Sequence, residues 1–169
     1  GAGGRRVGGL DVSQPGCLPP LLSRRILVVD DEPSILDVLE QTLTSAGAQV
    51  ETATDGPTAL ALVAAHRPDL ILLDLKMPGI DGYGVLRAVK ADPRLRRIPV
   101  VILTSSREEG DLALSYDSGA NSFLVKPLSF DGMRETVKTI AGYWLAINVG
   151  PPPPGDSGEP PDNDGEEPA

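Results

Sequence analysis

The chain has 169 residues, a length typical of one domain, and its 15 basic and 24 acidic side chains give a formal net charge of −9. This acidic balance argues against a nucleic-acid-binding module, which needs a basic face, and no apolar run approaches the roughly 18–20 residues of a membrane span. One cysteine and one histidine exclude a disulfide framework and a Cys/His zinc site, so we expect a soluble protein of cytoplasmic location.

The two ends of the chain differ in composition from its middle. Residues 1–20 are rich in glycine and proline, and residues 151–169 hold six acidic side chains, no basic ones and seven of the 17 prolines. Neither end has apolar periodicity, which predicts a disordered arm over 1–20 and an acidic, proline-rich disordered tail over 149–169. The folded domain is expected to span 21–148, and a second, DNA-binding domain is not expected.

Within 21–148, short apolar runs alternate with segments of helical periodicity. Continuous apolar runs at 26–29, 70–73, 100–103 and 123–125 predict strands buried on both faces of a parallel sheet, and residues 49–53 alternate as an edge strand does. Helical spacing covers 35–46, 58–65, 83–90 and 108–118, and a last helix carries an apolar stripe from Met133 to Leu145. This alternation predicts an α/β fold, a flavodoxin-like, doubly wound, five-stranded parallel sheet in the order 2-1-3-4-5.

Polar side chains follow four of the predicted strands at the point where each strand ends. Asp30 and Asp31 follow the first strand, Asp74 the third, Thr104 the fourth and Lys126 the fifth. The carboxyl ends of parallel strands lie along one edge of the sheet, where ligands bind in open α/β folds. We therefore expect three carboxylates, a hydroxyl and an ammonium to meet in one site.

Three neighbouring carboxylates repel one another, and a hard divalent cation such as Mg²⁺ relieves that repulsion. Asp31 and Asp74 are the expected direct ligands, with Asp30 acting through water. A carboxylate can also act as a nucleophile toward phosphorus and form an acyl phosphate, and Asp74, at the end of a central strand, is the best candidate. The metal ion, Lys126 and Thr104 would then offer partners to the three phosphoryl oxygens.

Four segments carry a family resemblance: ILVVDDEP (26–33), LILLDLKMPGIDG (70–82), ILTS (102–105) and GANSFLVKP (119–127). Together they resemble the CheY-like receiver domain of two-component response regulators over about residues 25–148. The resemblance implies that Asp74 accepts phosphate from a phosphohistidine, that Asp30 and Asp31 hold Mg²⁺, and that the backbone carbonyl of Lys76 also binds the metal.

The same resemblance implies a switch. Thr104 is the switch hydroxyl, Lys126 contacts the phosphate, and Phe123 is the aromatic residue that rotates inward when Thr104 moves. It also implies a cis Lys126–Pro127 peptide bond. His66 is expected at the surface or as a helix cap, and Ser106 is expected to border the site.

We expect a single-domain regulator whose output is a changed protein–protein surface and which catalyses at most its own phosphorylation and dephosphorylation. Its partners would be a sensor histidine kinase or histidine phosphotransfer protein and a downstream protein. The end of the last helix, Tyr143 to Asn148, is similar to single-domain receivers of bacterial phytochrome kinases, and a homodimer through helix 4, strand 5 and helix 5 is a further hypothesis. Two alternatives stay open: a haloacid-dehalogenase-like phosphatase, in which Lys76 stands where that family has an acid, and a receiver used only as a scaffold.

Overall fold

A computed structural model describes residues 24–77, 81–105 and 109–147, with the side chains of 109, 146 and 147 left out. Five parallel strands form one sheet in the order β2-β1-β3-β4-β5, as the sequence predicts. The strands are β1 (Arg25–Val29), β2 (Gln49–Ala53), β3 (Leu70–Leu73), β4 (Val100–Thr104) and β5 (Ser122–Val125). The predicted arm (1–20), the tail (149–169) and Ser106 lie outside the described residues.

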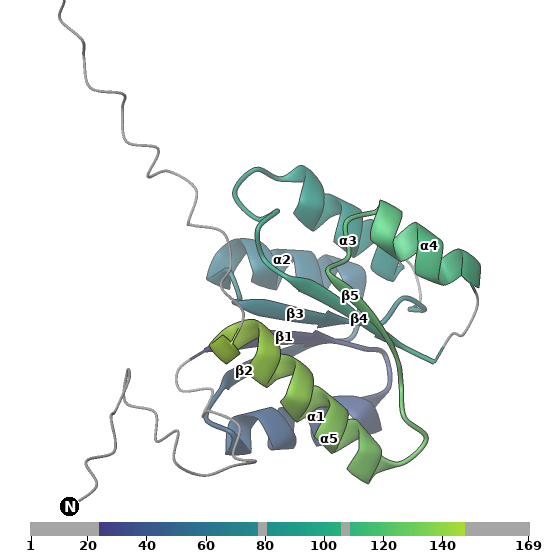
Figure 1. Ribbon diagram of the computed structural model, residues 1–169. Helices are drawn as coiled ribbons and strands as arrows, with labels where there is room; N and C mark the ends of the chain where they lie inside the picture. Colours follow the sequence, from purple (N-terminus) through teal and green to yellow (C-terminus); the bar gives the residue numbers. More distant parts are fainter. Residues whose placement is uncertain (1–23, 78–80, 106–108, 148–169) are drawn as a thin grey trace, which may run out of the picture.

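Helices cover both faces of the sheet (Figure 1). They are α1 (Pro33–Ser45), α2 (Gly56–His66), α3 (Gly82–Ala91), α4 (Glu109–Asp117) and α5 (Phe130–Gly142), followed by a π-helical turn, η1 (Tyr143–Ile147). α1 and α5 lie side by side on one face, and α2 and α3 pack together on the other. Within the described ranges, no helix combines the length and apolarity needed to cross a bilayer.

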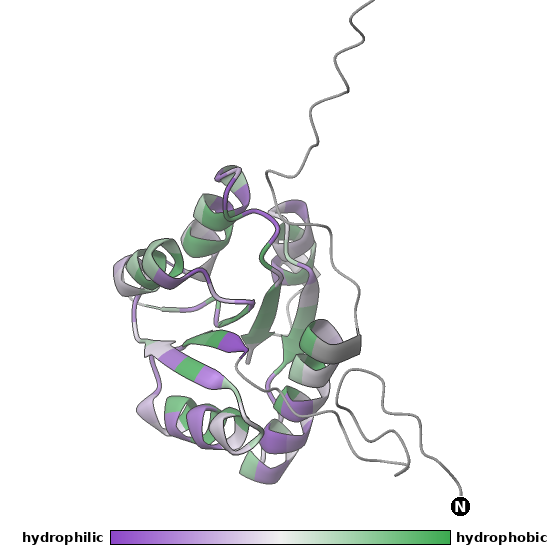
Figure 2. Cartoon of the chain, turned by 90° about the vertical axis from the view of Figure 1, so that its left-hand side faces the viewer, coloured by the Kyte–Doolittle hydropathy of each residue, from purple (hydrophilic) through white to green (hydrophobic). Residues whose placement is uncertain are grey.

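Alternate strand residues feed two hydrophobic cores, because successive side chains of a strand point to opposite faces. Leu27, Ile71 and Ile102 join the core under α2 and α3, whereas Ile26 and Leu72 join the core under α1 and α5. In Figure 2 the strands are mostly hydrophobic, and the helices mix hydrophobic and hydrophilic residues. The sheet is thus anchored from both sides, which fixes the positions at which its strands end.

Side-chain caps begin three of the helices. Asp55 accepts a hydrogen bond from the backbone N–H of Thr58 at 2.8 Å, Asp81 caps α3 through Gly84 at 3.0 Å, and Ser129 caps α5 in the same way. Caps of this kind contribute about 1 kcal/mol each by pairing N–H groups that have no partner within the helix. Two of these caps follow strand-end residues named in the sequence analysis: Asp81 comes after Asp74, and Ser129 comes after Lys126.

The structure corrects two of the predicted elements. Residues 123–125 are half-buried, not buried on both faces, because β5 is an edge strand with a neighbour on one side only. The last helix changes from α to π geometry at Tyr143. Trp144 still packs against the α1/α5 core, whereas its neighbour Tyr143 is 47% exposed.

Candidate functional site

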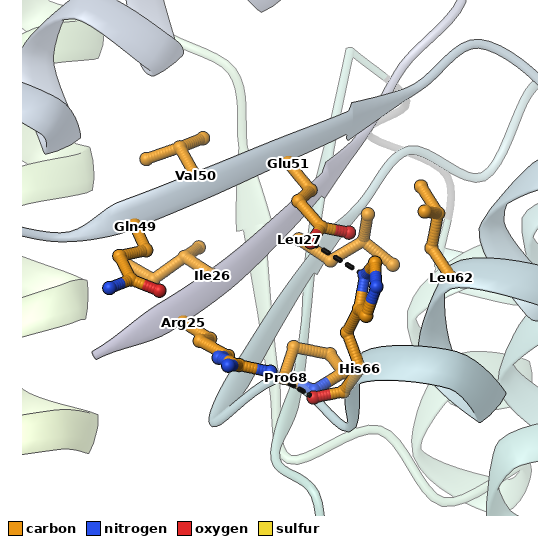
Figure 3. Close-up of a pocket in the computed structure, with 9 residues that line it drawn as sticks. All are labelled: Arg25, Ile26, Leu27, Gln49, Val50, Glu51, Leu62, His66 and Pro68. Atoms are coloured by element: carbon orange, nitrogen blue, oxygen red, sulfur yellow. Dashed lines mark hydrogen bonds and ion pairs between the residues drawn. The ribbon is translucent and has the colours of Figure 1, made fainter. Parts of the chain in front are cut away.

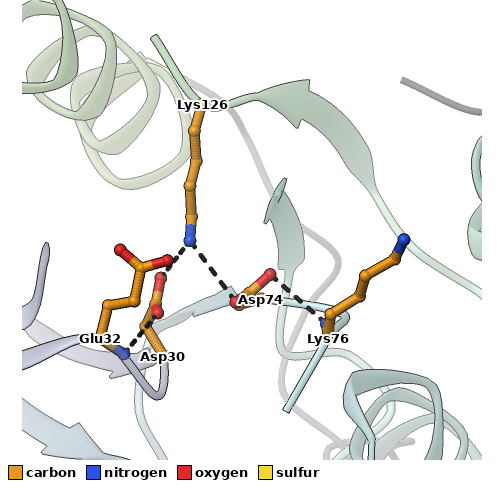
Figure 4. Close-up of polar contacts among 5 residues, drawn as sticks. All are labelled: Asp30, Glu32, Asp74, Lys76 and Lys126. Carbon is orange, nitrogen blue, oxygen red and sulfur yellow. Dashed lines mark hydrogen bonds and ion pairs between the residues drawn. The ribbon is translucent and has the colours of Figure 1, made fainter. Parts of the chain in front are cut away.

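The carboxyl ends of β1, β3 and β5 meet at one edge of the sheet and carry three charged side chains. Asp30 follows β1, Asp74 follows β3 and Lys126 follows β5, and all three are buried. β1 and β3 are paired neighbours, so the two aspartates leave the sheet side by side. Figure 4 shows the ammonium of Lys126 reaching toward both carboxylates.

Lys126 is held unequally by the two aspartates. Its Nζ lies 2.6 Å from Oδ2 of Asp30 and 3.4 Å from Oδ2 of Asp74. The shorter distance is that of a strong charge-assisted hydrogen bond, and the longer one is a weak contact. The ammonium therefore makes its shorter hydrogen bond to Asp30, while its charge still acts on Asp74, where it opposes the effect of burial on the pKa.

Burial controls the electrostatics of the three groups. Burial raises the pKa of Asp30 and of Asp74, and the nearby Lys126 opposes the increase at both without cancelling it. Burial also acts to lower the pKa of Lys126, but the hydrogen bond and charge of Asp30, together with the charge of Asp74, outweigh it, and the pKa is raised. Lys126 is therefore positively charged, and further positive charge nearby would stabilise the ionised forms of Asp30 and Asp74.

Two more predicted residues contact Asp74. The Thr104 hydroxyl hydrogen-bonds its carboxylate, and the backbone N–H of Lys76 lies 3.4 Å from Oδ1. Thr104 also accepts the backbone N–H of Lys126 through its carbonyl at 2.7 Å, which ties the end of β4 to the residue after β5. The predicted cis bond between Lys126 and Pro127 is wrong: the bond is trans, the isomer that X–Pro bonds favour by about 0.5–1 kcal/mol.

Asp31 lies at the rim of the site and not in its interior. Its side chain is exposed, and its carboxylate oxygens lie within 4.8 Å of those of Asp30 and Glu32. The backbone N–H of Glu32 donates to Asp30 at 3.0 Å, so the turn after β1 orients the buried aspartate. Glu32 has no predicted role, although it continues the acidic run and its carboxylate belongs to this cluster.

The donor set suits a hard divalent cation. The acidic side chains offer only oxygen atoms, which Mg²⁺ prefers, and no described histidine or cysteine stands among them. The buried Asp30, Asp74 and Lys126 leave a net formal charge of −1, and the exposed Asp31 adds a further negative charge at the rim. A dication therefore offsets negative charge that is partly buried.

The start of α3 rests on the backbone of the site. Gly82 donates its N–H to the carbonyl of Leu75 at 2.9 Å, and a Cβ placed on Gly82 would lie 2.2 Å from the carbonyl oxygen of Asp74. Only glycine allows so close an approach. α3 thereby fixes the segment that presents Asp74.

Phe123 is half-buried and packs against the α2/α3 core. It lies on β5 opposite Ile102 of β4, two residues before Thr104. This places the aromatic ring and the hydroxyl on neighbouring strands.

A separate cavity of about 260 Å³ lies between α2 and the first residues of β1 and β2 (Figure 3). Nδ1 of His66 lies 2.7 Å from Oε1 of Glu51 there, and Arg25 donates to the carbonyl of His66. His66 is exposed, as expected. The cavity is lined by Arg25 at the start of β1, whereas the acidic site follows the end of that strand, so the two are distinct.

Comparison with known proteins agrees with the geometry. The family model of the response regulator receiver domain matches residues 26–138. The response regulator PleD of Caulobacter vibrioides is 45% identical over 127 residues, which are 75% of this chain and 28% of PleD, so the chain spans just over a quarter of that relative.

Two solved structures whose chains are matched almost completely show the same likeness. The phosphorylated cyanobacterial phytochrome response regulator RcpA is 35% identical with a TM-score of 0.73, over 77% of this chain and 99% of its own. The Mn²⁺-bound response regulator Rcp1 is 33% identical with a TM-score of 0.70, over 76% of this chain and 99% of its own. The strand order, the buried Asp–Lys–Asp cluster and these matches lead to one conclusion: the chain belongs to the response regulator receiver domain family of two-component signalling.

Proposed function

We propose that this receiver accepts a phosphoryl group on Asp74 from a sensor histidine kinase, with Mg²⁺ bound beside it, and signals through a changed protein–protein surface. The observation that carries the proposal is the ammonium of Lys126 between Asp30 and Asp74. Response regulators receive phosphoryl groups from histidine kinases, and membership of the receiver family is consistent with a regulatory domain. Membership of this chain in the receiver family favours this function over a haloacid-dehalogenase-like phosphatase.

The transfer step follows from the resting contacts of Asp74. One of its carboxylate oxygens attacks the phosphorus of a phosphohistidine, the new O–P bond forms as the P–N bond breaks, and the bonding electrons leave with the imidazole. Because Asp74 is weakly held at 3.4 Å by Lys126, its oxygen keeps lone pairs available for attack. The Lys126 ammonium is close enough to pair with the added phosphoryl oxygens.

Asp30, Asp31 and Asp74, with the backbone carbonyl of Lys76, are the groups we assign to the metal ion. When bound, Mg²⁺ supplies positive charge that stabilises the phosphoryl oxygens during transfer. Asp30 orients Lys126 throughout, and Asp31 faces solvent where an ion enters. Glu32 adds a further carboxylate at the rim.

The response to phosphorylation is assigned to Thr104 and Phe123. The Thr104 hydroxyl, already bonded to Asp74, moves onto the phosphoryl group, and Phe123 on the neighbouring strand fills the space it leaves. Phe123 has no hydroxyl, so its inward position gains packing alone.

The likeness to RcpA and Rcp1, covered over 99% of their chains, supports a phytochrome-type kinase as the phosphoryl donor. A homodimer through α4, β5 and α5 stays a prediction. The exposed Leu112, Leu114 and Tyr116 of α4 would contribute apolar area to such an interface. Light scattering with and without phosphorylation tests it, and a monomer under both conditions contradicts it.

The proposed function is tested by incubating the full chain with a small acyl phosphate and reading the mass of the intact protein. We expect one added phosphoryl group that requires Mg²⁺ and is absent in Asp74→Asn. Asp37→Asn, an exposed aspartate on α1, is the matched control and should be labelled like the wild type. Labelling that persists in Asp74→Asn contradicts the assignment, and continued release of phosphate over many cycles points to a phosphatase instead. A protein that takes up neither Mg²⁺ nor phosphate points to a scaffold receiver.

A further inference from the structure

α4 is attached to the domain in a different way from the other helices. Among its described side chains only Ser115 is buried, whereas Leu112 and Leu114 are each 40% exposed and Tyr116 is 49% exposed. Neither hydrophobic core contains a described residue of α4. Burial of an apolar face is what normally fixes a helix on a sheet, so α4 depends on other contacts.

A polar contact from α3 supplies such an attachment. The hydroxyl of Tyr83 donates to Oδ1 of Asp111 at 2.7 Å and lies 3.2 Å from the backbone carbonyl oxygen of the same residue. Ser115 donates its hydroxyl to that carbonyl at 2.6 Å, one turn further along α4. The Tyr83 ring is 9% exposed and belongs to the α2/α3 core, so the hydroxyl is presented from a fixed position.

The charge state of Tyr83 favours this contact. Burial and the hydrogen bond with Asp111 raise the pKa of Tyr83 to about 12. The phenol therefore keeps its proton and remains a donor at physiological pH. A hydrogen bond from a neutral donor to a carboxylate belongs to the stronger class.

Tyr83 is also one residue from the contact between α3 and the phosphoacceptor segment. Gly82 packs on the carbonyl of Asp74 and donates to the carbonyl of Leu75. A displacement of the backbone at Asp74 therefore moves the first turn of α3, and Tyr83 belongs to that turn.

We propose that Tyr83 is a positioning residue whose hydroxyl fastens α4 to the domain and transmits displacements at Asp74 to α4. The fastening is independent of phosphorylation. The transmission rests on the proposed function, because it needs Asp74 to change state.

Amide hydrogen exchange of the full chain tests the fastening, with Tyr83→Phe as the variant that removes only the hydroxyl. We expect exchange in peptides covering 109–117 to become about tenfold faster, while peptides covering α1 keep their wild-type rates. Tyr116→Phe removes the same atom from an exposed tyrosine on α4 and should leave exchange unchanged. Equal rates in Tyr83→Phe and wild type overturn the proposal, as does faster exchange throughout the domain.

A second variant separates a broken fastening from damage to the core. Asp111→Ala acts from the α4 side, where the residue is partly exposed, and should accelerate exchange of α4 as Tyr83→Phe does. The double variant should add little to the larger single effect, since both changes remove the same hydrogen bond to Oδ1 of Asp111. Additive effects contradict a direct Tyr83–Asp111 interaction.

Beryllofluoride with Mg²⁺, a mimic of the phosphoryl group, tests the transmission. In the wild type we expect altered exchange both around Asp74 and in α4, and in Tyr83→Phe only around Asp74. An α4 response of equal size in both proteins overturns the transmission. No change in exchange around Asp74 in the wild type would count against the proposed function. The exchange rates of wild type and Tyr83→Phe without beryllofluoride would still test whether the Tyr83 hydroxyl fastens α4.

Discussion

Gly82→Ala should destabilise the protein strongly, although alanine is the better helix former. The added Cβ would lie 2.2 Å from the carbonyl oxygen of Asp74 and 2.7 Å from Cα of Leu75, whereas ordinary van der Waals contact begins at 3.4 Å. The shortfall, 3.4 minus 2.2, is 1.2 Å at the oxygen, and both neighbours are backbone atoms that cannot rotate away. Either α3 or the segment carrying Asp74 must move.

The expected cost follows from this overlap. Overpacking in a well-packed region typically costs about 1–3 kcal/mol, and a clash with backbone belongs at the upper end. The helix propensity of alanine recovers less than about 1 kcal/mol at the first helical position. We expect a net loss of about 2–3 kcal/mol, which for a domain of this size lowers Tm by about 10 °C.

Gly110→Ala on α4 is the matched control, because nothing lies within 4 Å of a Cβ placed there. It should stabilise the protein by up to about 1 kcal/mol. Thermal unfolding followed by circular dichroism measures both variants, and intact-protein mass after acyl-phosphate treatment should show less labelling of Gly82→Ala. If Gly82→Ala unfolds at the wild-type temperature or above, α3 does not rest on the backbone of Asp74, and the reasoning fails.

Three further predictions concern charge. Lys126→Met leaves Asp30 and Asp74 buried without their ammonium and should lower the free energy of unfolding by about 3–5 kcal/mol at pH 8. Because burial raises the pKa of both carboxyls, they protonate as the pH falls and the loss should shrink. Urea unfolding at pH 5 and pH 8 measures the loss, and equal losses contradict this prediction. Mg²⁺ at ten times its Kd should stabilise the wild type by about 1.4 kcal/mol, and the corresponding rise in Tm should vanish in Asp31→Asn but persist in Asp37→Asn. Burial lowers the pKa of Lys90 from 10.5 to about 8, so the unfolded chain binds more protons than the folded chain between these pH values. The free energy of unfolding of the wild type, relative to that of Lys90→Met, should therefore rise from pH 8 to pH 10.5. A difference between the two proteins that does not change with pH refutes this prediction.

Much of the fold was predictable because local pattern and burial agree. The apolar runs at 26–29, 70–73 and 100–103 are buried strands, as expected, since strands inside a parallel sheet have helices on both faces. The run at 123–125 has the same composition but lies at an edge, and composition alone does not show how many neighbours a strand has. The π-helical turn from Tyr143 likewise depends on how the end of the last helix packs. The apolar stripe from Met133 to Leu145 does not predict that packing.

The site was predictable to the level of residues but not of contacts. The strand ends indicated that Asp30, Asp74 and Lys126 would meet, and they do. That Lys126 lies closer to Asp30 than to Asp74 depends on side-chain placement within a fraction of an ångström, which spacing does not specify. Neither the Tyr83–Asp111 hydrogen bond nor the three acceptors of Lys90, at Arg96, Ile98 and Asn121, had a sequence signal, because each joins segments through the tertiary fold.

The unequal distances from Lys126 to Asp30 and Asp74 bear on the proposed phosphoryl transfer. If the ammonium were bound equally to both aspartates, Asp74 would have to break a strong charge-assisted hydrogen bond before attacking phosphorus, and that cost would raise the barrier to transfer. With Nζ of Lys126 at 2.6 Å from Asp30, the positive charge stays in place while its hydrogen bond to Asp74 is long, at 3.4 Å. Under the proposed function, the same buried lysine pairs with Asp30 in the resting domain and lies within reach of phosphoryl oxygens added at Asp74. Asp30 is therefore expected to matter for transfer even where it does not touch the metal ion.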